Sequence, residues 1–185
     1  AEALFRENLE MRRRALGPEH PETIFALYNI GNLLRQVGRL DEAEPLLREA
    51  LAARRRTLGV DHIETVDSMS QLAFLLKERR KFAEAADLLG EGVAVQRGRL
   101  KASDPALGLS LYNWAATLQN AEKSDKAEPI FREIIAAYEK NRWKDEPYFA
   151  AAHNGLAKCL DGRGEFAEAD PMYQKGLQMR RQLDK

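Results

Sequence analysis

The 185-residue sequence lacks several features that mark whole classes of protein. It has one cysteine, so no disulfide can form within the chain, and we expect a reducing, cytoplasmic environment. No apolar run approaches the roughly 18 residues that a membrane span needs, and the first residues lack the basic-then-apolar layout of a signal peptide. Its 29 Lys and Arg are balanced by 29 Asp and Glu, which argues against a dedicated nucleic-acid binder.

The sequence also lacks motifs that carry chemistry. It has no phosphate-binding glycine loop, no metal-ligand spacing and no nucleophile elbow, so we expect no catalytic residue, no metal and no cofactor. Carboxylates recur at Glu42, Glu44, Glu84 and Glu168, but these positions begin expected helices. The positive end of the helix dipole accounts for acidic residues there without acid–base catalysis. The sequence therefore predicts a protein that is not an enzyme.

The chain is built from an internal repeat of 42 residues. The segment 42–47, Glu-Ala-Glu-Pro-Leu-Leu, recurs in related form at 84–89, 126–131 and 168–173. A second pattern, with large residues around a Gly or Ala, begins at Leu27 and recurs at the same interval. Such periodicity indicates a stacked array. We expect a single array over 1–185, made of the second helix of a partial unit and four full units: 1–16, 17–58, 59–100, 101–142 and 143–185.

Each half of the unit has apolar residues at three- and four-residue spacing, which is typical of an amphipathic helix. Small residues recur at 31, 73, 115 and 157 in the first half and at 43, 85, 127 and 169 in the second, where two helices can cross closely. We therefore expect antiparallel helix pairs and no strand. The expected first helices are 21–37, 63–79, 105–121 and 147–163, and the expected second helices are 1–15, 40–58, 82–100, 124–141 and 166–184.

These patterns resemble the tetratricopeptide repeat: a large residue, then Leu-Gly or Leu-Ala, and later Ala before an aromatic residue. The segments 16–23 and 58–65, with Asn29 and Asn113, resemble the kinesin-light-chain type of this repeat. The resemblance covers essentially the whole chain. It implies an all-α fold, a right-handed solenoid of antiparallel helix pairs, whose first helices line a concave face.

The resemblance also implies that the concave face binds a peptide. Amide side chains there could hold an extended chain through its backbone, and tyrosines could supply contact area. The alternative is that these groups bond to neighbouring helices and water. The candidate groove residues from the four first helices are Phe25, Tyr28, Asn29, Asn32, Arg35, Ser70, Gln71, Lys77, Tyr112, Asn113, Asn120, Asn154 and Lys158.

Basic residues cluster near the ends of the second helices, at Arg12, Arg13, Arg54, Arg55 and Arg56. Cations there complement the negative end of the helix dipole, so a solvated ridge is one interpretation. The other is an edge for acidic partners, with binding that weakens as salt is raised.

Three further side chains have structural interpretations. Cys159 falls at a core position and is expected to be a small buried apolar residue. His20 and His62 lie one repeat apart in turns, where helix capping is favoured over metal binding.

The sequence thus predicts a non-catalytic scaffold that binds a peptide or protein segment in its groove. The alternative is a structural subunit of a larger assembly, contacting its neighbours through the convex ridge and terminal helices.

Overall fold

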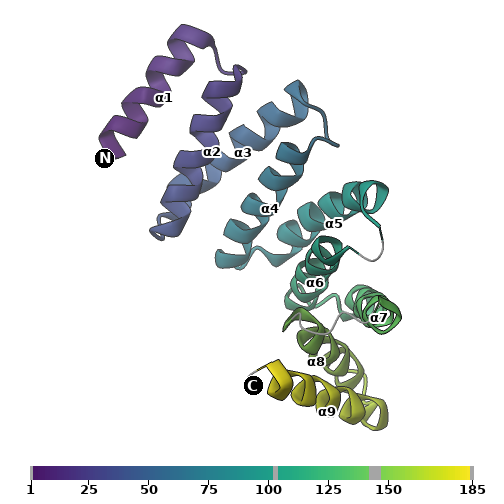
Figure 1. The fold of residues 1–185 in the computed structure, drawn as a ribbon. Helices are drawn as coiled ribbons and strands as arrows, with labels where there is room; N and C mark the ends of the chain where they lie inside the picture. Colours follow the sequence, from purple (N-terminus) through teal and green to yellow (C-terminus); the bar gives the residue numbers. More distant parts are fainter. Residues whose placement is uncertain (1, 102–103, 142–146, 184–185) are drawn as a thin grey trace. The chain divides into compact units, whose positions relative to one another are not determined.

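The computed structural model describes residues 2–101, 104–141 and 147–183 (Figure 1). These residues form nine α-helices and no strand. The helices are α1 (Glu2–Leu16), α2 (Pro21–Gln36), α3 (Leu40–Thr57), α4 (Ile63–Glu78), α5 (Phe82–Arg99), α6 (Pro105–Asn120), α7 (Ser124–Asn141), α8 (Pro147–Asp161) and α9 (Phe166–Leu183). All nine expected helices are confirmed, with ends within two residues of the sequence prediction.

The chain divides into two compact units, Ala1–Leu88 and Leu89–Lys185, called here unit 1 and unit 2. In unit 1, α2 packs against α3, and α3 against α4. In unit 2, α6 packs against α7, α7 against α8, and α8 against α9. Each unit is thus a stack of antiparallel helix pairs, and the continuous array over 1–185 stays a prediction.

Small residues set the closeness of the helix pairs, as the repeat predicts. Gly31 on α2 is buried, and a Cβ added there would lie 2.8 Å from the side chain of Leu47 on α3. The equivalent alanines Ala73, Ala115 and Ala157 are fully buried. Because interiors are close-packed, a larger side chain at these crossings would separate the helices.

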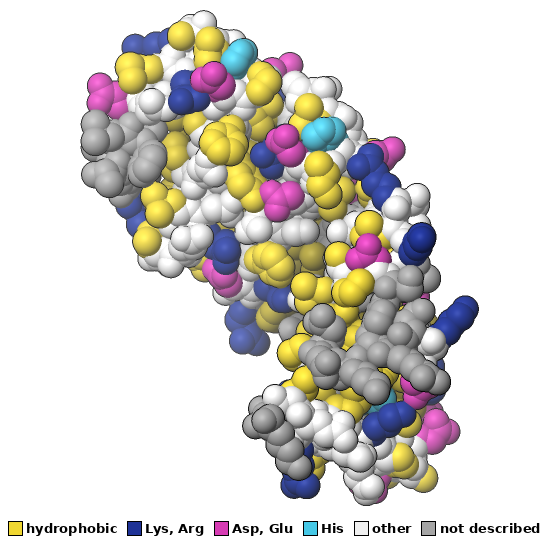
Figure 2. Space-filling view, in the orientation of Figure 1, with side chains coloured by type: hydrophobic (Ala, Val, Ile, Leu, Met, Phe, Trp, Pro, Cys, Tyr) yellow, Lys and Arg dark blue, Asp and Glu magenta, His cyan; other side chains and the backbone are white. Residues whose placement is uncertain are grey.

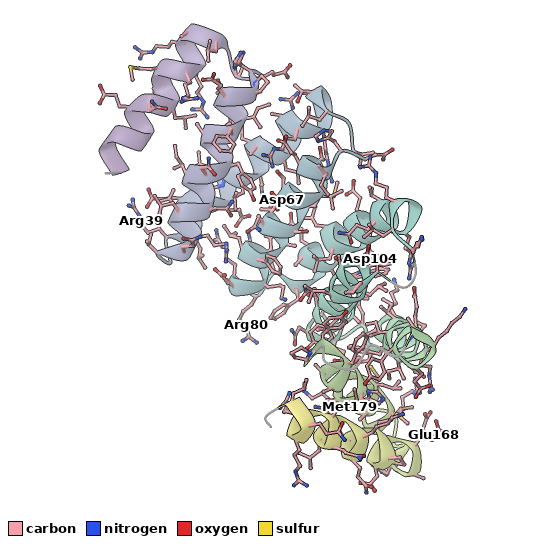
Figure 3. All side chains as sticks on the ribbon, in the orientation of Figure 1. Arg39, Asp67, Arg80, Asp104, Glu168 and Met179 are labelled. Carbon is pink, nitrogen blue, oxygen red and sulfur yellow. The ribbon has the colours of Figure 1, made fainter. Side chains whose placement is uncertain are left out.

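The helix ends follow from local chemistry. The ring Nδ1 of His20 accepts a hydrogen bond from the Glu22 amide at 3.2 Å, and His62 caps α4 in the same way at 3.3 Å. The predicted capping role of both histidines is confirmed. At the other end of the first helices, Gly38 and Gly164 adopt positive φ, which only glycine does without cost. The repeat-equivalent residues Arg80, labelled in Figure 3, and Glu122 adopt it too.

Two acidic residues in the second helices gather cations around them. Glu44 on α3 is nearly buried and lies 2.7–2.8 Å from Arg48, Arg79 and Lys81. Two repeats later, Glu128 on α7 is bonded to Arg132 and Arg163. The hydrogen bond from Arg163 lowers the pKa of Glu128. These clusters tie a second helix to the turn that follows the next first helix.

Candidate peptide-binding face

The first-helix face of unit 1, formed by α2 and α4, is crossed by a polar network. The Tyr28 hydroxyl on α2 is hydrogen-bonded to the carboxylate of Asp67 on α4 (labelled in Figure 3). The guanidinium of Arg54, from α3, lies 4.5 Å from the centre of the Tyr28 ring and 3.8 Å from Asp67. Burial, together with the Asp67 hydrogen bond, raises the pKa of Tyr28 to about 12. Tyr28 therefore connects α2 to both α3 and α4.

Other predicted groove residues of unit 1 also bond within the unit. Arg35 on α2 lies 2.6 Å from Glu78 on α4, and the Ser70 hydroxyl donates to the carbonyl of Val66 in its own helix. Lys77 lies 5.5 Å from the centre of the Phe74 ring, and burial lowers the pKa of Lys77.

The remaining predicted groove residues of unit 1 differ in exposure. Phe25 is 59% exposed, Asn29 is exposed and Gln71 is partly exposed. Asn32 has a buried Oδ1 with no partner among the described residues. On the face seen in Figure 2, acidic and basic side chains are interspersed with apolar ones over this unit.

The first-helix face of unit 2, formed by α6 and α8, is hollowed instead. A cavity of about 580 Å³ lies between the amino-terminal halves of the two helices. Its lining is mostly apolar: Pro105, Ala106, Leu109, Tyr112, Pro147, Tyr148, Ala151 and Arg180. The Tyr148 hydroxyl donates to the carbonyl of Pro105 at 3.0 Å, which fixes the two helices to each other beneath the cavity.

A second, polar recess of about 290 Å³ continues along the same two helices. It shares Tyr112, Ala151 and Arg180 with the first cavity. Its polar lining comes from Gln119, Asn120, Asn154 and Lys158. The Gln119 amide donates to the carbonyl of Gly155 at 2.7 Å, so it forms part of the floor. The combined face has mostly apolar walls at one end and amides with Lys158 at the other, and Arg180 lines both ends.

The predicted groove residues thus have different surroundings. In unit 2, Tyr112, Asn120, Asn154 and Lys158 lie together around the hollow, whereas Asn113 lines neither cavity. The prediction omitted Pro105, Pro147 and Arg180. Arg180 lies on a second helix, α9, and could have been found from its position, since it is the repeat equivalent of Arg54 and Arg12.

The predicted basic ridge requires a correction. Arg54 is only 4% exposed, because its guanidinium turns inward to Glu64, Ser68 and Asp67 on α4. It cannot belong to a surface for acidic partners.

The other four ridge residues are half-buried or exposed and bonded within the chain. Arg12 pairs with Glu22, Arg13 with Glu10 and Glu49, and Arg56 with Glu19. Arg55 is exposed and also has an interaction within the chain.

Within the described residues, no cluster of three or more His, Cys, Asp or Glu side chains could hold a metal ion. In the same part of the chain, no helix has the length and apolar character needed to cross a bilayer. Cys159 is a buried free thiol, which confirms the core position predicted for it.

Stacked helix pairs with an open, partly apolar face define the class of helical-repeat interaction scaffolds. The profile described as tetratricopeptide repeat matches residues 1–56, 25–98 and 107–182. The chain belongs to the tetratricopeptide repeat family. Among curated proteins, none matches this sequence.

Solved structures confirm the all-α tetratricopeptide solenoid. A Podosopora anserina protein with nearly identical TPR-like repeats of the kinesin light chain type is 22% identical, with a TM-score of 0.84 over 97% of this chain and 85% of its own. BtubC (BKLC) from P. vanneervenii is 18% identical, with a TM-score of 0.80 over 100% and 73%. YrrB, described as a TPR protein with an unusual peptide-binding site, is 16% identical, with a TM-score of 0.62 over 97% and 76%. The fold is that of a protein–protein interaction scaffold with kinesin-light-chain-like repeats.

Proposed function

We propose that this chain is a non-catalytic scaffold that binds an extended peptide segment of a partner protein on the α6/α8 face of unit 2. The observation that carries the proposal is the cavity of about 580 Å³ lined by Leu109, Tyr112 and Ala151, continuous in its lining with a polar recess. Binding sites for small or extended ligands are concave, mostly apolar and furnished with a few polar groups. The family resemblance implies a peptide on this face, and YrrB, which has the same fold, is described as having a peptide-binding site.

The face suits a short extended segment. Each of α6 and α8 is about 24 Å long, and about seven extended residues span that distance. Apolar side chains of the peptide would enter beside Tyr112, and its backbone would bond to the amides of Asn120 and Asn154. Arg180 lines both cavities, whereas Lys158 and the amides line only the polar one, so the two ends of a bound peptide meet different side chains.

The test is a selection of random-sequence displayed peptides on the wild-type chain, followed by affinity measurements. Ala151 lines both cavities, so Ala151→Arg should fill them and weaken the selected peptides by at least about tenfold. The matched control is Ala136→Arg, the same change at an exposed position of α7, which should leave the affinity unchanged. Equal affinity of both variants and the wild type would reject the face.

A second candidate, a subunit of a larger assembly, is favoured by a separate observation. Met11 on α1 is 56% exposed and Leu16 on the same helix is also exposed. Exposed apolar residues on one helix suit a contact with another protein. Sedimentation of the chain with and without Met11→Lys and Leu16→Lys separates the candidates, since only an assembly contact depends on these residues.

The partner and compartment belong to the same proposal. With equal numbers of basic and acidic residues, a protein partner is favoured over a nucleic acid. The lone cysteine, a free thiol, supports a cytoplasmic location.

A further inference from the structure

Three large apolar side chains are exposed near the amino-terminal ends of α2 and α4 in unit 1. Phe25 on α2 is 59% exposed, Ile63 at the start of α4 is 63% exposed, and Val60 in the turn before α4 is 41% exposed. A single exposed apolar residue is ordinary on a protein surface, whereas a contiguous group of them marks a site of contact with another molecule. These three side chains therefore mark such a site if they lie together.

The hydrogen bond between Tyr28 and Asp67 brings two of these side chains together. It joins α2 to α4, and these helices run parallel because each is antiparallel to α3. Phe25 precedes Tyr28 by three residues and Ile63 precedes Asp67 by four, so each lies one turn before the bond on the same side of its helix. Val60 is three residues before Ile63 in the adjoining turn. Phe25, Val60 and Ile63 thus form one surface, called here the unit 1 patch.

The exposure of the unit 1 patch belongs to its positions in the repeat. One repeat after Phe25 stands Asp67, whose side chain is 45% exposed although α2 and α3 precede it in the stack. Leu109, two repeats after Phe25, is 47% exposed. At the position of Ile63, the other three repeats have exposed prolines: Pro21, Pro105 and Pro147. Since stacked neighbours leave these positions uncovered, a further repeat stacked on the array would leave the unit 1 patch open.

Carboxylates flank the unit 1 patch and outnumber the cations beside it. The four carboxylates that flank the patch residues in sequence are Glu22, Asp61, Glu64 and Asp67. Arg12 and Arg54 pair with three of them. A further arginine, Arg56, is already paired with Glu19. Asp61 is exposed and has no ion-pair partner among the residues that the structure describes. Two arginines thus balance only two of the four carboxylates, so the surroundings of the patch are negative.

We propose that the unit 1 patch docks an amphipathic helix of a partner protein whose apolar stripe is flanked by Lys or Arg. Packed helices lie about 8–10 Å apart, which is close to the roughly 10.5 Å between positions i and i+7 of one helix. One apolar stripe can therefore contact both Phe25 and Ile63. The basic flank is drawn to Asp61, and an acidic helix is repelled, because complementary charge selects the partner. This surface shares no residue with the peptide site proposed for unit 2.

The test is a selection of displayed helical peptides, randomised on one face of a fixed helix, on the wild-type chain. Helices that bind the wild type and Ala151→Arg equally are kept, because Ala151 lines both cavities of the α6/α8 face and ligands of that face are thereby removed. We expect the kept helices to carry Lys or Arg beside Leu, Ile or Phe. Titration calorimetry should show a loss of about tenfold or more in Phe25→Ala, and a smaller loss in Asp61→Lys that high salt removes.

The control is Phe166→Ala, the same change at an exposed phenylalanine of α9, which should leave the affinity within about twofold of the wild type. The proposal is overturned if no helix is kept, if the kept helices are acidic, or if Phe25→Ala and Phe166→Ala have equal effects. Sedimentation of the chain alone checks another occupant: self-association that Phe25→Ala abolishes would assign the patch to a second copy and overturn the proposal. The peptide site of unit 2 is tested by ligands that Ala151→Arg loses, so either proposal can fail without the other.

Discussion

Tyr28 and Tyr112 occupy the same position of their first helices, two repeats apart, yet they meet different neighbours. In unit 1 the Tyr28 hydroxyl bonds to Asp67, and Arg54 covers the ring. In unit 2 the position equivalent to Asp67 is Ala151, and the space that a carboxylate would fill is part of a cavity. The change from Asp67 to Ala151 is thus one of the differences between a face closed by bonds and an open one.

A second difference lies beneath the two faces. Arg54 and Glu64 form a polar bridge between α3 and α4, whereas their equivalents in unit 2 are Tyr138 and Tyr148. Both tyrosine rings pack against the Phe149 ring in tilted arrangements, with ring centres 4.3 Å away for Tyr138 and 4.4 Å away for Tyr148. The repeat backbone is therefore held by a charge network in one unit and by aromatic contacts in the other. In unit 2, which has the aromatic contacts, polar and apolar side chains of α6 and α8 line the two cavities.

The largest predicted effect comes from a substitution that removes the charge network of unit 1. Arg54→Ala removes a buried guanidinium that bonds to Ser68 and the Glu64 carbonyl, and should lower the free energy of unfolding by about 2–4 kcal/mol. Urea unfolding measures it. Arg56→Ala, which removes an exposed arginine with one ion pair, should cost less than about 1 kcal/mol. Equal costs for the two changes would contradict the network.

The second largest predicted effect comes from disturbing the aromatic packing of unit 2. Gly155 on α8 gives the Phe131 ring its space, so Gly155→Ala should cost about 1–3 kcal/mol through overpacking. Gly98 is helical with nothing near its Cβ position, so Gly98→Ala should be neutral or stabilise by up to about 1 kcal/mol. Thermal unfolding of both variants checks the signs. A neutral Gly155→Ala would mean that the floor of the unit 2 face is loosely packed.

A pH dependence extends the comparison, because unit 2 buries a histidine, His153, at the position where unit 1 buries Met69. His153 is fully buried on α8, its Nδ1 lies 2.9 Å from the Phe149 carbonyl, and burial lowers the pKa of His153. Since the unfolded chain binds the proton more readily, this contribution to stability is fully present above pH 6.5 and is lost progressively as the pH falls from that value towards the lower pKa of the folded chain.

The urea midpoint should therefore decrease between pH 7.5 and 5.5 in the wild type. It should change less in His153→Gln, which cannot titrate there. Glu128, whose pKa is lowered by Arg163, acts only below its ordinary value of 4.5 and does not interfere. Identical pH profiles for the two proteins would exclude His153 as the cause.

The smallest effect concerns ion pairs between successive second helices. Arg13 and Glu49 in unit 1 and Arg97 and Glu133 in unit 2 are 36 residues apart and bonded at 2.6 and 2.5 Å. In the next such pair of unit 2 the two charges are exchanged, since the acid, Glu139, lies on the earlier helix and pairs with Lys175 on the later one. Because these pairs are exposed, Glu139→Lys should cost only about 0.2–1 kcal/mol. Adding Lys175→Glu should restore the stability, and high salt should remove the difference.

The fold could be predicted in detail because the repeat fixes two helical periods and their crossings. The end of α8 at Asp161, two residues before the predicted end, reflects the turn at Gly162 and the positive φ of Gly164. Arg80 and Glu122 adopt the same φ without being glycine, so composition alone could not have marked those turns.

The site could be predicted only in part. Repeat register assigns Tyr28 and Tyr112 to one face, but it does not show that Asp67 and Arg54 occupy the space beside Tyr28. The three consecutive arginines 54–56 resemble a ridge, yet successive helical residues point about 100° apart, so one of the three must face inward. The position of a residue in the repeat predicts the direction of its side chain. Its bonding partner depends on the residues that the neighbouring helices place beside it.

The central claim is that the α6/α8 face of unit 2 binds an extended peptide. The most direct measurement is an NMR chemical-shift map of the whole chain with a peptide selected on it. We expect the largest shifts at Tyr112, Ala151, Asn154 and Lys158, with those of α2 and α4 nearly unchanged. Shifts concentrated on unit 1 or on the exposed side of α7 would contradict it.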